Sequence, residues 1–168
     1  MSKWTAYQLL VGVVFVVLIT INNVFAIQIA KFFSFTETYI ASSLLIIFFT
    51  VILVIWGFMT LLLLQEKKGK PLFTHKIWRI MPAISGGLFL LSVVAFLALF
   101  LTIFSDLSVE MRWVLDIIVI YFLALFYMMI LSIVLRYGKA DTSKGVIITS
   151  ANTAVLILFA ILFLGALV

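Results

Sequence analysis

The chain has 168 residues, of which 67% are hydrophobic and 10% are charged, with a formal net charge of +5. Globular proteins carry roughly 25% charged residues, so this composition excludes an ordinary water-soluble domain. The charges lie in short clusters between long uncharged runs, which is typical of a polytopic helical membrane protein. There is no cysteine and one histidine, which excludes disulfides, thiolate chemistry and bis-histidine haem ligation.

Four uncharged runs exceed a hydrocarbon core about 30 Å thick as α-helices, and one more, residues 117–135, reaches that length once Val114 and Leu115 are included. We therefore expect an all-α bundle of five transmembrane helices in one domain, residues 1–168. The predicted spans are residues 5–30, 39–65, 78–104, 112–135 and 145–167. Transmembrane strands fit less well, because these runs lack the alternation of polar and apolar residues that a barrel strand shows. The first run exceeds the usual apolar region of a signal peptide, so we expect a retained anchor.

Lysine and arginine are unevenly divided among the connections. Nine of the 11 precede the first span or lie in the second and fourth connections, while Lys31 and Arg112 lie in the first and third. Because cytoplasmic loops carry an excess of basic residues, this bias predicts a cytoplasmic N-terminus and an outside C-terminus. Tryptophan and tyrosine residues flank the spans at both ends, as membrane interfaces favour. Trp56 lies inside the second span, where we expect it to pack against another helix.

The connection between the second and third spans is the most distinctive polar stretch. Gly69 and Pro71 are expected to end the second helix, and Thr74 to cap the third. The basic residues of this loop are Lys67, Lys68, Lys70, Lys76 and Arg79. Lipid headgroups are the nearest anions to a loop beside membrane spans, so we expect it to contact anionic lipid or a partner protein, and not a nucleic acid.

One group of polar residues lies towards the predicted outer surface. Asn22 and Asn23 are near the outer end of the first span, and Arg112 and Asp116 are near that of the fourth. Two interpretations remain open. The group forms an Arg112–Asp116 ion pair with asparagines bonding between helices, or it lines an outward-facing cavity that binds a ligand or cation at Asp116.

A second polar group lies on the fifth span. Thr149, Asn152 and Thr153 share one face about 6–12 Å from the inner end of the helix. Their depth is too shallow for contact with the outer group. We expect them to hydrogen-bond between helices of the bundle.

Catalysis is not expected, because the 6 acidic residues are scattered and the single histidine lies in the basic loop. No cofactor or metal site is expected either. We expect a small non-catalytic membrane protein acting through helix–helix contacts, such as an accessory subunit, assembly factor, regulator or self-protection protein. Its partner would be another membrane protein or a second copy. The alternative is a small transporter or channel protomer with a polar site around Asp116. Eight lysines against three arginines, with abundant isoleucine and phenylalanine, indicate an AT-rich bacterial genome, and so a bacterial plasma membrane.

Overall fold

The structure, a computed structural model, describes residues 3–24, 39–68, 73, 76–102, 112–138 and 142–165. Some side chains within these ranges are not described, namely those at 18, 19, 22–24, 39–46, 100–102, 112 and 165. All regular secondary structure in the described ranges is helical. The expectation of an all-helical chain is therefore confirmed for this part of the protein.

Five α-helices and one short 3-10 helix make up the described part of the chain. They are α1 (Lys3–Val24), α3 (Tyr39–Glu66), η1 (Lys76–Arg79), α4 (Met81–Thr102), α5 (Arg112–Tyr137) and α6 (Ser143–Gly165). Helices α3, α4, α5 and α6 each contain a segment long and apolar enough to cross a membrane. In α1 the corresponding apolar segment is shorter, Lys3–Val17. Four of the five predicted spans thus meet the length criterion within the described residues.

Local chemistry explains where several helices begin and end. Pro82 is the second residue of α4, where its missing N–H removes no helical hydrogen bond. The hydroxyl of Thr142 accepts from the backbone N–H of Gly145 at 3.0 Å and so caps α6. At the end of α5, the N–H of Gly138 donates to the carbonyl of Val134 at 2.7 Å. A Cβ at this glycine would overlap that carbonyl oxygen, so the close approach requires glycine.

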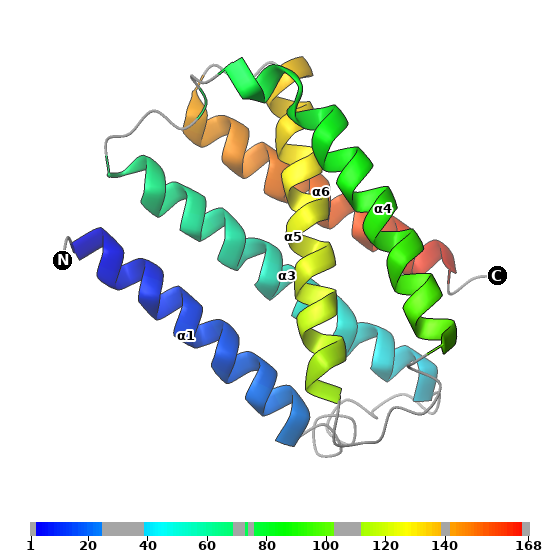
Figure 1. Cartoon of the computed structure of the whole chain (residues 1–168). Helices are drawn as coiled ribbons and strands as arrows, with labels where there is room; N and C mark the ends of the chain where they lie inside the picture. The colour runs from blue at the N-terminus through cyan, green and yellow to red at the C-terminus, as the bar shows by residue number, and fades with distance from the viewer. Residues whose placement is uncertain are drawn as a thin grey trace.

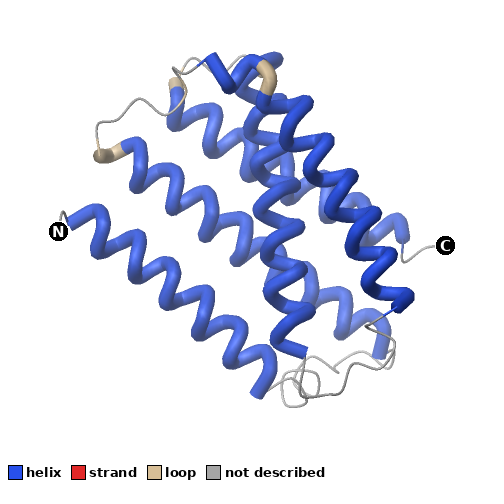
Figure 2. Tube along the Cα trace, in the orientation of Figure 1, coloured by secondary structure: helices blue, strands red, loops and turns tan. Residues whose placement is uncertain are grey.

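Successive helices run in opposite directions across the bundle (Figures 1 and 2). The start of α1, the end of α3, the start of α4, the end of α5 and the start of α6 therefore share one end. Helix α5 is central, because it contacts α1, α3, α4 and α6. Helix α6 packs on α3 and α5, whereas α4 contacts only α5 and η1 among the described elements.

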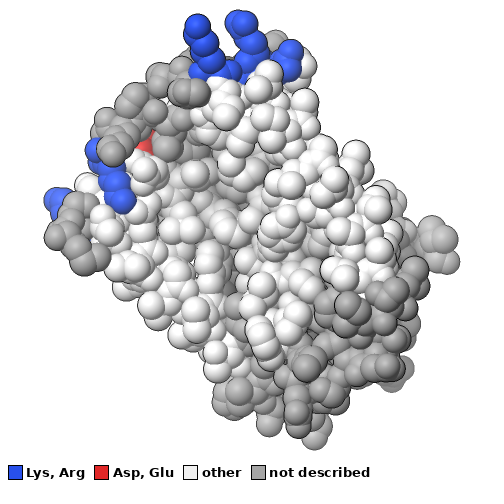
Figure 3. Space-filling model, in the orientation of Figure 1, with Lys and Arg blue, Asp and Glu red and all other residues white. Residues whose placement is uncertain are grey.

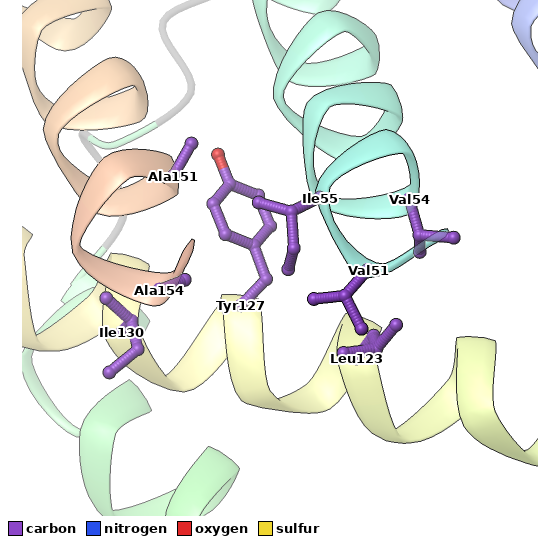
Figure 4. Close-up of a cluster of buried hydrophobic side chains, with 8 residues drawn as sticks. All are labelled: Val51, Val54, Ile55, Leu123, Tyr127, Ile130, Ala151 and Ala154. Carbon is purple, nitrogen blue, oxygen red and sulfur yellow. The ribbon is translucent and has the colours of Figure 1, made fainter. Parts of the chain in front are cut away.

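The core lies where α3, α5 and α6 meet. Tyr127 projects from α5 between α3 and α6, with Ile55 on one side and Ala151 on the other (Figure 4). Its side chain is 1% exposed, and its hydroxyl donates to the carbonyl of Ile147 at 3.2 Å. Ala151 and Ala154 are fully buried, and their small size allows α6 to approach the ring closely.

The distribution of polar and apolar side chains suits lipid surroundings. Ser85 of α4 and Ser132 of α5 are buried and their hydroxyl oxygens are 3.3 Å apart, while Leu91 and Val94 of α4 are both 68% exposed. Large apolar side chains cover the outside, which water would penalise and hydrocarbon does not. The expected packing role of Trp56 is wrong, because this side chain is 53% exposed on α3.

Candidate functional site

Basic side chains gather at the end of the bundle where α1 begins and α3 and α5 end, here called the positive end (Figure 3). Its described members are Lys3, Lys67, Lys68, Lys76, Arg79, Arg136 and Lys144. Alternating helix direction brings these residues together from five separate segments. The described basic residues of the second and fourth connections, which the sequence places on one side of the membrane, therefore do lie at the same end.

Hydrogen bonds join α1 to the end of α3 at this position. The Gln8 amide donates to Gln65 Oε1 at 3.1 Å and to the Leu61 carbonyl at 3.4 Å, while Lys68 Nζ donates to Gln8 Oε1. Lys67 Nζ lies 5.2 Å from the centre of the Trp4 ring, within the range of a cation–π interaction. Lys67 and Lys68 thus tie two helices together.

A second feature of the positive end is an open hollow of about 500 Å³. We call it the basic hollow, and its lining residues are Phe73, Lys76, Trp78, Arg79, Leu135 and Arg136. The rings of Phe73 and Trp78 pack edge to face, with their centres 5.0 Å apart. Lys76, Arg79 and Arg136 are exposed, so their charges are accessible. The hollow combines an apolar floor with a cationic rim.

Arg136 is the basic residue of this hollow that lies outside the loop between the second and third spans. It belongs to the end of α5, and its guanidinium donates to the carbonyl of Arg79 at 3.0 Å across a separation of 57 residues. The five loop residues predicted as one basic group are divided by the fold. Lys67 and Lys68 turn towards α1, Lys76 and Arg79 line the hollow, and Lys70 lies outside the described residues. In the sequence, only the presence of basic residues in both the second and the fourth connections indicated that Arg136 and Arg79 would lie close together.

The predicted outer group is described only in part. Asn22 and Asn23 belong to the last turn of α1 and Arg112 begins α5, but their side chains lie outside the described set. Asp116 is partly exposed on α5. Helices α1 and α5 contact each other and converge in Figure 1 towards the end where α1 finishes and α5 begins. The ligand-site and ion-pair interpretations both stay predictions.

The predicted bonding of the polar group on α6 within the bundle is not supported. Thr149 and Asn152 are exposed and Thr153 is half-buried. The buried polar residue of this helix is Ser150, whose hydroxyl donates to the Val146 carbonyl of its own helix at 2.6 Å. Helix α6 is rotated so that Ala151 and Ala154 lie in the core beside Tyr127 of α5, which leaves Thr149 and Asn152 on the outside.

Comparison of the chain with known protein families, with curated proteins and with solved structures finds no match. Among the described residues, two features offer polar groups to a ligand or to another protein. One is the basic hollow, which offers a guanidinium fork and an ammonium to an anion. The other is the outer face of α6, which offers an amide and a hydroxyl to a neighbouring helix.

Proposed function

We propose that the protein is a non-catalytic integral membrane protein that acts through helix–helix contact, with the outer face of α6 as its contact surface. The observation that carries this proposal is the exposure of Thr149 and Asn152 within the membrane-length segment Ser143–Leu164. An accessory subunit, assembly factor, regulator or self-protection protein of a membrane system would use such a surface.

The depth of Asn152 supports this proposal. At 1.5 Å per residue it lies about 14 Å along α6 from Ser143, inside a hydrocarbon core about 30 Å thick. No water is present at that depth to hydrogen-bond an amide. A helix from another polypeptide satisfies the amide, and such interhelical bonds contribute about 0.6–2 kcal/mol.

The residues around Asn152 suit close helix packing. Gly145, Thr149 and Thr153 recur every four residues, and Leu156 is 67% exposed on the same side as Asn152. Small residues at this spacing let two helix backbones approach, and threonine hydroxyls bond across the contact. An asparagine amide both donates and accepts, so it suits a second copy of α6 as well as a polar residue of another protein.

We further propose five crossings, with the N-terminus in the cytoplasm and the C-terminus outside, in the plasma membrane of a bacterium. The alternating helix directions and the charge of the positive end support this orientation, because basic residues favour the cytoplasmic side. Helix α1 would be the fifth span. The excess of lysine over arginine, 8 against 3, supports the bacterial assignment.

Photo-crosslinking in native membranes tests the contact surface. A benzoylphenylalanine at position 156 is compared with one at position 94 of α4. Leu156 is 67% and Val94 is 68% exposed, and each stands at the same distance from the start of its helix. We expect one defined protein adduct from position 156 and none from position 94. The adduct mass identifies a second copy or another protein.

Repeating the crosslinking with Asn152→Leu measures how much the Asn152 amide contributes to the helix–helix contact. Loss of about 0.6–1.7 kcal/mol lowers the adduct yield roughly threefold to eighteenfold. Asn152→Leu replaces an exposed amide with an exposed apolar side chain, which lipid tolerates, so we expect the fold of the chain to be preserved. Equal yields from positions 156 and 94, or no adduct from either, would contradict the proposal.

A further inference from the structure

We propose that the basic hollow binds the phosphate headgroup of an anionic phospholipid as a discrete, stoichiometric ligand. The ligand would have its phosphate between Lys76, Arg79 and Arg136, with its apolar part against Phe73, Trp78 and Leu135. This binding is independent of the contact proposed for α6.

The positive charge that lines the hollow favours the binding of an anion. Lys76, Arg79 and Arg136 converge on a single hollow, and none of the described residues that line it is acidic. The acidic residues in the described part of the chain, Glu66 and Asp116, do not line it. Like charges brought together repel one another, and a bound anion replaces this repulsion with attraction.

Arg136 is held in position before any ligand arrives. Its guanidinium donates to the Arg79 carbonyl at 3.0 Å, and its charge lies 5.2 Å from the centre of the Tyr137 ring. A guanidinium has five N–H donors in a fixed fork, so this bond occupies one of them. Holding a fork in place reduces the ordering cost of binding, and guanidinium matches phosphate geometry with two parallel bonds.

A lipid uses the whole hollow, whereas free phosphate uses only the rim. The aromatic pair of Phe73 and Trp78 forms an apolar floor at the level of the helix ends, where tryptophan meets headgroups. Ile80, just before α4, and Ile84, in its first turn, are 55% and 46% exposed. They continue the apolar surface along α4 into the depth that acyl chains occupy.

The number of cations indicates the class of lipid. Three basic side chains match a headgroup with more than one negative charge better than a singly charged one. Cardiolipin and phosphatidic acid are of this class. Phosphatidylglycerol should bind more weakly, and zwitterionic phosphatidylcholine more weakly still.

Native mass spectrometry of the purified full-length protein tests the site. The protein in detergent is titrated with cardiolipin, phosphatidylglycerol or phosphatidylcholine. We expect one cardiolipin per chain at the lowest concentrations. The double variant R79Q/R136Q should weaken this binding about tenfold or more, because charge-assisted bonds to both guanidinium groups are lost. The charge-preserving R136K should weaken it by a smaller factor, because lysine keeps the charge but not the fork.

The matched control removes two charges from the same end but outside the hollow. K3Q/K144Q should keep cardiolipin affinity within about twofold, since neither residue lines the hollow. Unchanged helical circular dichroism and elution volume show that each variant is folded. Equal weakening in R79Q/R136Q and K3Q/K144Q would overturn the discrete site and leave only general surface attraction. Displacement of cardiolipin by millimolar inorganic phosphate would overturn the lipid as the ligand in favour of free phosphate.

Discussion

Replacing Tyr127 with alanine should lower the free energy of unfolding by about 3 kcal/mol. The ring is 1% exposed and fills the space between α3 and α6. Replacing a large aromatic side chain with alanine in a core costs about 3–5 kcal/mol, through lost contacts and the cavity left behind. In lipid the transfer part of this cost is smaller, because hydrocarbon replaces water around the unfolded helices. We therefore expect the lower end of that range.

Equilibrium unfolding in mixed detergent micelles measures this effect, followed by circular dichroism and by loss of tertiary contacts. Tyr127→Phe isolates the hydrogen bond to the Ile147 carbonyl and should cost only about 1 kcal/mol. Tyr137→Ala is the matched exposed control, because that tyrosine is 70% exposed. A Tyr127→Ala protein as stable as Tyr137→Ala would show that the three helices do not meet at this ring.

Replacing Gly57 with leucine should destabilise the protein by about 1–3 kcal/mol and loosen α1 from α3. A Cβ built on Gly57 overlaps the ring of Phe15, which packs against Phe58 with ring centres 5.4 Å apart. Forcing extra atoms into a filled contact displaces side chains or backbone at about this cost. Helix α1 should shift, since it packs only on α3 and α5 among the described helices.

The matched control for this change is Gly87→Leu in α4, where a Cβ meets nothing within 4 Å. That variant should be as stable as the wild type or slightly more so, because leucine favours a helix more than glycine does. Unfolding in mixed micelles and protease sensitivity of α1 provide the two measurements. Similar stabilities for the two leucine variants would mean that α1 does not pack against Gly57.

The positions of the helices could be predicted from the sequence because hydrocarbon imposes a simple length requirement. Uncharged runs predict helices within a few residues of those observed for α3, α4, α5 and α6, and charged clusters mark the turns between them. The meeting of the two basic turns at one end follows from the same alternation. These features depend only on local composition and on the direction in which each helix runs.

The rotation of each helix could not be predicted in the same way. Apolar residues surround these helices on all sides, so the hydrophobic pattern does not distinguish the face towards lipid from the face towards neighbours. Trp56 and Asn152 were therefore expected inside and lie outside. In lipid the inward face is chosen by close packing, as Ala151 and Ala154 against Tyr127 illustrate.

The basic hollow depends on a tertiary contact that composition does not encode. Lys76 and Arg79 were recognised as part of a charged loop, but their separation from Lys67 and Lys68 follows from how η1 turns against the end of α5. The bond between Arg136 and the Arg79 carbonyl joins segments 57 residues apart. Only the relative placement of α4 and α5 brings these charges to one hollow.

Cysteine accessibility in intact cells tests the central claim of five alternating crossings most directly. The chain contains no cysteine, so each single substitution is a unique label site. The four substitutions are Lys3→Cys, Lys67→Cys, Lys144→Cys and Val168→Cys. With a membrane-impermeant maleimide, we expect positions 3, 67 and 144 to be labelled only after lysis and position 168 to be labelled in intact cells. Labelling of positions 3 and 168 from the same side, or of 67 and 144 from opposite sides, would contradict the fold and orientation proposed for this protein.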